Sequence, residues 1–143
     1  MIAVQTKLNG GMIEGLDKFA DEIRETILFS GVAAMAKVIY DEAREQCPVS
    51  EKGHWFHGTH QKYYFDAGTL KASIYRVYSP EKSNGDKKLY RISWNHKKAP
   101  YGYMVEFGTS RAPAHPFMRP AFDRINDAIA IGKARMAEKM DEL

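Results

Sequence analysis

Apolar residues recur at three- and four-residue steps over the first third of the chain, which is the spacing of one face of a helix. The positions that follow this rule are Met12, Leu16, Phe19, Ile23 and Ile27, and then Met35, Val38 and Ile39. The Ser30-Gly31 pair is a candidate kink or break in this helix. We therefore expect the most regular helix over the Ala-rich stretch 31–46, which ends because Pro48 disfavours helical geometry at Cys47.

A second helical stripe follows near the C-terminus, and its members are Phe122, Ile125, Ile129, Met136 and Met140. Gly132 lies on the turn between Ile129 and Met136. A glycine inside a helix costs about 1 kcal/mol relative to alanine. We therefore expect Gly132 to permit the close approach of a neighbouring element.

Strand patterns occur in two regions. Residues 2–8 alternate, with Ile2, Val4, Thr6 and Leu8 on one face, and predict a short strand that ends at Asn9-Gly10-Gly11. Residues 70–78 and 88–95 are rich in β-branched and aromatic residues, and the segment 79–86 between them has the composition of a turn. They predict an antiparallel hairpin whose second strand turns Tyr90, Ile92 and Trp94 toward the helices.

The stretch 99–121 holds four of the six prolines. Its apolar spacing before Gly108 predicts one or two helical turns. Residues 109–116 are predicted to be a stiff loop, because Pro113 and Pro116 lack an amide donor and bias the preceding residues toward extended geometry. Pro120 suits the first turn of the helix that follows, and Phe117, between the two prolines, is a candidate core anchor.

These elements together predict an α+β fold in one domain over residues 1–143. The expected architecture is a small antiparallel sheet with a β-hairpin packed against two long helices, plus a short helix before the proline-rich loop.

The run Tyr101-Gly102-Tyr103-Met104-Val105-Glu106-Phe107-Gly108-Thr109, followed by Pro116-Phe117-Met118-Arg119-Pro120-Ala121, resembles the signature of the tail-component family of long-tailed bacteriophages. Upstream, Cys47-Pro48 and the stretch 66–74 resemble the family's middle motif. The resemblance spans roughly residues 10–130. The positions that match the motif are Gly68, Leu70, Ser73, Tyr101, Tyr103, Glu106, Phe107, Gly108, Thr109, Pro116, Phe117, Arg119 and Pro120.

This resemblance implies a structural protein of the virion, without enzymatic activity or a cofactor, made in the host cytoplasm and placed in the tail or neck. The family role is tail completion or head–tail joining by a ring, six-fold like the tail tube, at the head-proximal end of the tail. The implied partners are further copies of the chain, the tail tube or tail terminator, and the head–tail connector proteins, with genomic DNA passing through the ring and no membrane involved.

The sequence departs from the family pattern at residues 50–65, where an insertion is polar at first and then rich in aromatic residues and histidines. We interpret it as a solvated or interface-forming loop with no regular structure. The candidate interface residues are Trp55, Phe56, Tyr63 and Tyr64, together with Arg111 in the proline-rich loop. The insertion and the loop 109–115 are thus two candidate surfaces for contacts between copies.

Composition narrows the class of protein only modestly. A single cysteine, Cys47, leaves no internal disulfide and is best read as a small buried hydrophobe. No apolar run reaches 18 residues, and the first residues lack the layout of a signal peptide, so we expect a soluble protein made inside a cell. The net charge of +3 is too small to require a nucleic acid partner.

Candidate chemistry is sparse. His54, His57 and His60 suggest a metal site, but neither a helix nor a strand brings all three together, so a site is not favoured. Glu106 is better explained as a structural acceptor of hydrogen bonds, which holds the turn at Gly108, than as a catalytic group. The alternative function is nucleic-acid binding by the hairpin, with stacking residues Tyr75, Tyr78, Tyr90 and Trp94 and basic residues Lys82, Lys87, Lys88, Arg91, Lys97 and Lys98.

Overall fold

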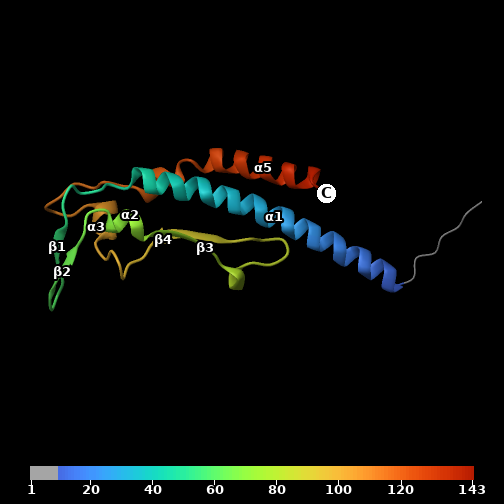
Figure 1. Ribbon diagram of the computed structural model, residues 1–143, viewed down its shortest axis with the longest axis horizontal. Helices are drawn as coiled ribbons and strands as arrows, with labels where there is room; N and C mark the ends of the chain where they lie inside the picture. The colour runs from blue at the N-terminus through green and yellow to red at the C-terminus, as the bar shows by residue number, and fades with distance from the viewer. Residues whose placement is uncertain (1–9) are drawn as a thin grey trace, which may run out of the picture.

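One long helix, α1 (Gly10–Gln46), is the axis of the computed structural model, which describes residues 10–143 (Figure 1). The strand predicted over residues 2–8 lies outside the described residues. Along the chain there follow β1 (His54–His57), β2 (Lys62–Phe65), α2 (Thr69–Ser73), β3 (Ile74–Tyr78), a 3-10 turn η1 (Pro80–Lys82), β4 (Tyr90–Trp94), α3 (Gly102–Phe107), α4 (Met118–Phe122) and α5 (Ile125–Asp141).

The α+β prediction is confirmed, and the two long helices, α1 and α5, pack together. Helix α5 runs along one side of α1, and the β3–β4 hairpin lies along the other side, so α1 is the middle layer (Figure 1). No helix within residues 10–143 is long and apolar enough to cross a membrane.

Helix α1 continues without interruption through Ser30 and Gly31, so the predicted candidate break is wrong. Ser30 Oγ donates to the Ile27 carbonyl oxygen at 3.0 Å, and Gly31 is buried at the crossing with α5. A Cβ atom at Gly31 would lie 2.8 Å from the Met136 sulfur and 3.1 Å from the Gly132 carbonyl oxygen. The glycine therefore serves close helix packing and not a bend.

Helix α5 packs on α1 through small residues. Ala128 and Gly132 are its buried positions, and a Cβ at Gly132 would lie 3.0 Å from the Gly31 carbonyl oxygen, which confirms the predicted close approach. The predicted apolar stripe is only partly right, because Phe122 and Met140 are exposed to 62% and 61%. Two glycines that face each other let the backbones meet, and large side chains at the ends of the stripe then fall outside the contact.

The predicted hairpin is present as the antiparallel pair β3–β4, with Ile74 opposite Trp94 and Tyr78 opposite Tyr90. Its first strand starts later than predicted, because residues 69–73 form α2. Phe29 of α1 packs edge-on against Tyr78, with ring centroids 5.0 Å apart, and also contacts Tyr90. The opposite face of the hairpin carries the exposed Val77 and Arg91, so one face packs on α1 and the other is mixed, as predicted.

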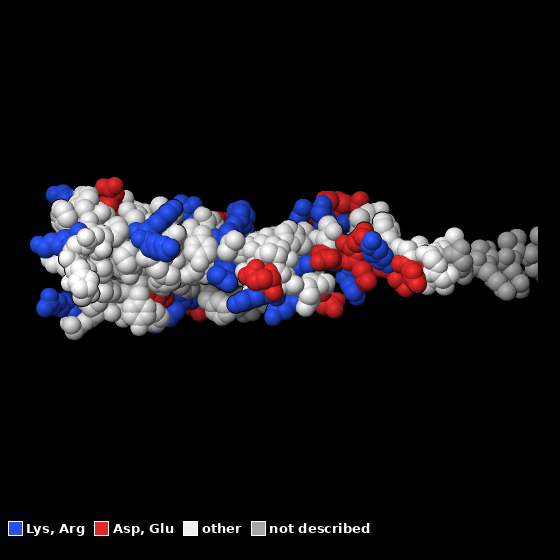
Figure 2. Space-filling view, turned by 90° about the horizontal axis from the view of Figure 1, so that it is seen from below, with Lys and Arg blue, Asp and Glu red and all other residues white. Residues whose placement is uncertain are grey.

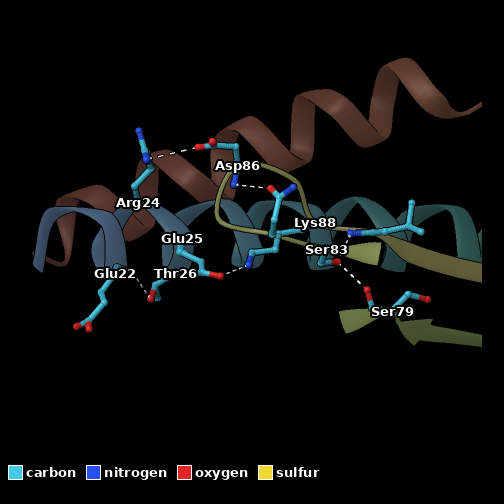
Figure 3. Close-up of polar contacts among 10 residues, drawn as sticks. Glu22, Arg24, Glu25, Thr26, Ser79, Ser83, Asp86 and Lys88 are labelled. Carbon is cyan, nitrogen blue, oxygen red and sulfur yellow. Dashed lines mark hydrogen bonds and ion pairs between the residues drawn. The ribbon is translucent and has the colours of Figure 1, made fainter. Parts of the chain in front are cut away.

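Polar contacts tie the connection between β3 and β4 to α1 (Figure 3). Lys88 pairs with Glu25, and Arg24 lies 3.4 Å from Asp86. Within the connection, Ser83 Oγ donates to the Ser79 carbonyl oxygen at 2.7 Å. The turn is therefore fixed against α1 at the level of residues 24–25.

The insertion is not the unstructured loop that the sequence suggested. Its two four-residue segments pair as an antiparallel hairpin, β1–β2, with His54 opposite Phe65 and His57 opposite Lys62. The turn between them is closed by a 2.9 Å hydrogen bond from Gly58 N–H to the Gln61 carbonyl oxygen. A two-stranded hairpin is marginal by itself, so its contacts with the rest of the chain matter for the site.

Candidate functional site

The site begins with the short helix α3, which the sequence predicted correctly and which ends at Gly108. Gly108 has φ of 77°, in the left-handed region that favours glycine, and a Cβ there would lie 2.7 Å from the Ala114 nitrogen. His115 N–H donates to the Val105 carbonyl oxygen at 2.8 Å, which closes the loop 109–115 back onto α3. The loop is thus a fixed structure at the end of α3.

Thr109 organises the tip of this loop. Its hydroxyl accepts the backbone N–H groups of Arg111 at 3.3 Å and Ala112 at 3.1 Å, and its own N–H donates to the Ala112 carbonyl oxygen at 2.9 Å. Such a turn uses the hydroxyl in place of backbone partners. Arg111 is left exposed at the tip.

Glu106 connects α3 to the start of α4. One carboxylate oxygen accepts the backbone N–H groups of Phe117 at 2.7 Å and Met118 at 3.0 Å. The other accepts the backbone N–H and the side-chain Nε of Arg119, both at 3.0 Å. Arg119 also donates to the Glu106 carbonyl oxygen at 2.6 Å. The structural role predicted for this carboxylate is borne out in kind, but its partners are the first residues of α4 and not the turn at Gly108.

The environment of Glu106 stabilises its charged form. Burial, which leaves the residue only 2% exposed, raises the pKa of the carboxyl, but the hydrogen bonds from Phe117, Met118 and Arg119 lower it more, so that the pKa lies below its usual value. With both oxygens occupied by donors inside the protein, the carboxylate is not directed at a substrate. This arrangement fits a structural clasp between two helices.

Phe117 is the core anchor that the sequence predicted. It is fully buried, and its ring lies 5.6 Å from that of Trp94 in an edge arrangement. The same cluster includes Leu70 and Ile74, together with Ala43 and Cys47 at the end of α1. Burial raises the pKa of the Cys47 thiol to about 11, which fits the packing role predicted for this residue.

Trp94 was identified as a strand residue, but its contact with α3 was not predicted. A Cβ at Gly102 would lie 2.6 Å from Trp94 Cε2, so only glycine lets α3 pack against the indole. Within residues 10–143, the buried Trp94 Nε1 has no hydrogen-bond partner. No local sequence signal links Gly102 to a residue on another element.

An apolar groove of about 470 Å³ lies beside α3. Its lining includes Val49, Leu70, Tyr101, Met104 and Pro113. Ser50 and His54 of the insertion contribute to it, and so do Thr109 and His115 of the proline-rich loop. The insertion and the proline-rich loop, predicted as two candidate surfaces for contacts between copies, therefore both contribute walls to one groove.

Aromatic contacts attach the β1–β2 hairpin to the groove. Tyr101 packs against His54 at 4.5 Å and against Phe65 at 5.0 Å between ring centroids. Phe56 lies on the same side, 6.3 Å from Tyr101. Trp55 and Tyr64 pair with each other on the other face, at 5.3 Å, and are exposed. Of the candidate interface residues, Trp55, Tyr63, Tyr64 and Arg111 are exposed, whereas Phe56 is half-buried.

The motif residues divide into two groups. The structural positions Leu70, Ser73, Glu106 and Phe117 are buried, and Gly68, Gly108, Pro116 and Pro120 are half-buried and shape turns or helix starts. Tyr103 and Phe107 are exposed and stack on each other at 4.9 Å, with the Arg119 guanidinium 4.8 Å from the Phe107 ring. Val49, which lines the groove next to the motif residue Pro48, was missed because a single apolar residue in a loop carries no periodic signal.

The structure gives little support to other chemistry. No group of three His, Cys, Asp or Glu residues within the described part of the chain is arranged to hold a metal ion. Three of the four rings proposed for base stacking are engaged in packing, since Tyr78 and Tyr90 contact Phe29 and Trp94 is buried. The hairpin β3–β4 therefore presents no row of free aromatic faces to a nucleic acid.

Comparison with known proteins identifies a family. A sequence profile described as "Bacteriophage HK97-gp10, putative tail-component" matches residues 10–108, which is more than half of the chain. The match includes α1, both hairpins and α3, and it ends before the proline-rich loop and α4. No curated protein and no solved structure matched the chain.

Proposed function

We propose that this protein, which belongs to the HK97 gp10 family of bacteriophage tail components, completes the phage tail and joins it to the head. In this proposal copies of the chain form a ring, six-fold like the tail tube, at the head-proximal end of the tail. The observation that carries the proposal is the family match across residues 10–108.

The geometry of the site supports an assembly role. Its buried carboxylate, Glu106, is used inside the protein, while apolar and aromatic side chains such as Met104 and Trp55 are exposed around the groove. Exposed aromatic residues at a stiff, preformed surface are typical of protein interfaces. The partners proposed are further copies of the chain, the tail tube or terminator on one side and the connector on the other, with genomic DNA passing through the ring.

The proposal is tested by complementation. Tails produced without this protein are mixed with DNA-filled heads, and joined particles are counted by electron microscopy with and without the purified chain. We expect joining only after the chain is added, and six copies per tail by mass measurement. Equal joining without the chain would overturn the proposed function, and a copy number other than six would overturn the six-fold ring alone.

A further inference from the structure

The N-terminal part of α1 extends beyond both of its neighbours. Figure 1 shows that α5 and the β3–β4 turn end while α1 continues. The last residues of α5 reach α1 near Phe19 and Ile23, where Leu143 and Ile27 help to line a hollow of about 340 Å³. Among the described residues, neither α5 nor the β3–β4 turn covers α1 before Phe19, and at Phe19 and Ile23 it is approached only by the end of the chain.

Residues 10–23 of α1, the projecting stretch, carry an apolar stripe. Leu16, Phe19 and Ile23 fall within roughly 60° of one another around the helix axis. Leu16 is 53% exposed and Phe19 is 61% exposed. The same stripe continues into Ile27, which is half-buried beside α5. An apolar helix face of this type is a common ligand of a hydrophobic groove.

The groove beside α3 lies at the opposite end of the molecule. Its residues Pro48 and Val49 follow the last turn of α1, so nearly the whole helix, about 55 Å for 37 residues, separates it from the projecting stretch. The stripe of one molecule therefore cannot reach its own groove (Figure 1). A volume of about 470 Å³ is within the usual range of roughly 300–1,000 Å³ for sites that enclose apolar groups, and suits a few large side chains.

The two ends also carry opposite charge. Residues 10–23 contain four acidic residues and one lysine, whereas the segments 48–71 and 96–119, which form the groove end, contain seven lysines and arginines against three acidic residues. Figure 2 shows most of the Asp and Glu side chains in the half of the molecule that carries the projecting end, with some Lys and Arg among them, and mainly Lys and Arg side chains at the other end. An acidic helix and a basic groove end attract each other on approach.

We infer that the projecting stretch of α1 in one copy seats its stripe, Leu16 and Phe19, in the groove beside α3 of the next copy. The contact joins two different surfaces, so each copy can use both, and the result is a closed ring or an open chain according to the angle between copies. This inference rests on the proposed ring and supplies its subunit contact.

The first test separates the two surfaces in solution. The helix variant Leu16→Ser with Phe19→Ser and the groove variant Met104→Asp are each made in the full chain. Met104 is an exposed member of the groove lining. At concentrations where the wild-type chain associates, each variant alone is expected to stay monomeric by sedimentation. Their mixture is expected to form only 1:1 dimers, because a single intact helix and a single intact groove remain.

Ile131→Ser is the matched control, because Ile131 is an exposed apolar residue on α5 outside both surfaces. It is expected to associate like the wild type. Wild-type association that survives in either variant alone would overturn the inference, and so would a mixture that stays monomeric. If the wild-type chain remains monomeric at every concentration, the cross-linking test on tails decides whether the inference holds.

The second test uses the chain bound to tails. The double variant Leu16→Cys with Met104→Cys should give a ladder of disulfide-linked multimers, while Ile131→Cys with Met104→Cys should not. The native Cys47 is 5% exposed, and its burial keeps it from competing. If heads join such tails and no ladder forms, the inference is wrong and the proposed function stands. If heads join tails equally well without the chain, the proposed function fails whatever the ladder shows.

Discussion

The Glu106 carboxylate fixes the start of α4 against α3, because it accepts the backbone N–H groups of residues 117–119. Replacing it by Gln keeps the size of the side chain but puts an amide donor against the N–H groups that now donate to it. We expect Glu106→Gln to lower the free energy of unfolding by about 1.5–3 kcal/mol, the usual value for hydrogen bonds to a charged group. Urea unfolding measures the loss, and Glu51→Gln, at an exposed position, is the control with a change within about 0.5 kcal/mol.

The same carboxylate predicts a dependence of stability on pH. Burial raises the pKa of Glu106, but its hydrogen bonds lower it more, so the folded pKa lies below the ordinary value of 4.5. The stabilisation is therefore present above pH 4.5 and is lost as the pH falls through the folded pKa. We expect the difference in stability between the wild type and Glu106→Gln to shrink as the pH is lowered from 6 toward 3. A difference that stays constant would contradict the ionised clasp.

Phe117 is the residue whose loss should damage the core most. Because it is fully buried against Trp94, Phe117→Ala should cost about 3–5 kcal/mol, a large part of the roughly 5–15 kcal/mol that holds a domain together. Phe117→Leu keeps most of the volume and should fold with a smaller loss, so the effect remains measurable if the alanine variant aggregates. Phe122→Ala, at the exposed end of α4, should melt like the wild type in calorimetry.

At this scale the sequence allowed the roles of Glu106 and Phe117 to be predicted, because a carboxylate beside a glycine turn and an aromatic residue between two prolines each have a local explanation. The contact between Trp94 and Gly102 was not predicted, because it joins residues on separate elements whose packing no local pattern encodes.

At the scale of elements, the crossing of α1 and α5 predicts that a Gly→Ala substitution changes stability in opposite directions at two positions. Gly132→Ala should destabilise the protein by about 1–3 kcal/mol, because the added methyl would meet the Met35 side chain and lie 3.0 Å from the Gly31 carbonyl oxygen. Gly15→Ala, in the exposed part of α1 with nothing within 4 Å, should instead stabilise it by about 0.5–1 kcal/mol. Thermal unfolding of the two variants checks both signs, and a stabilised Gly132→Ala would mean that the helices do not meet closely there.

The β1–β2 hairpin should depend on Tyr101 for its order. A pair of short strands is marginal alone, and Tyr101 supplies its ring contacts with His54 and Phe65. In Tyr101→Ala we expect hydrogen exchange of the strand amides to rise strongly while the amides of α1 near α5 stay protected. Tyr103→Ala, at an exposed position on α3, is the control and should leave the hairpin unchanged. Unaltered protection of the hairpin in Tyr101→Ala would show that other contacts hold it.

The two long helices and the β3–β4 hairpin were predictable because each repeats a periodic pattern over several turns or along paired strands, whereas the short helix α2 was predicted as the start of a strand. The β1–β2 hairpin was missed because its strands have four residues each and place aromatic rings on both faces, which hides the alternation of a half-buried strand. The uninterrupted course of α1 through Ser30 and Gly31 was also missed, since the packing of Gly31 against α5 outweighs its weak helix propensity.

For the whole molecule, sequence reasoning predicted the insertion and the proline-rich loop as candidate contact surfaces but could not show that they line one groove. Both segments lie near the end of α1. The loop is held there by its contact with α3, and the insertion by the contact of His54 with Tyr101. The projecting stripe was predicted only as one face of a helix, because its spacing is identical to that of buried helix faces and does not show whether another element covers it. Leu16 and Phe19 are exposed because α5 ends before it can cover them, and the sequence pattern does not show where α5 ends relative to α1.

The opposite charge of the two ends predicts that assembly is sensitive to salt through its rate. Charges that face each other across a contact mainly accelerate the encounter, and salt shortens their reach, from about 30 Å at 0.01 M to about 8 Å at 0.15 M and 3 Å at 1 M. We therefore expect the rate of cross-linking in the Leu16→Cys, Met104→Cys chain to fall several-fold as sodium chloride is raised from about 0.01 to 0.5 M, while dissociation changes little. Neutralising the projecting helix with Glu14→Gln and Asp17→Asn should flatten this dependence, because both are exposed acidic residues of the projecting stretch. The control Asp123→Asn removes an exposed acidic charge outside both surfaces and should keep the wild-type slope. A rate that is independent of salt in the parent chain would leave the apolar stripe as the only attraction between copies and would contradict the charge argument.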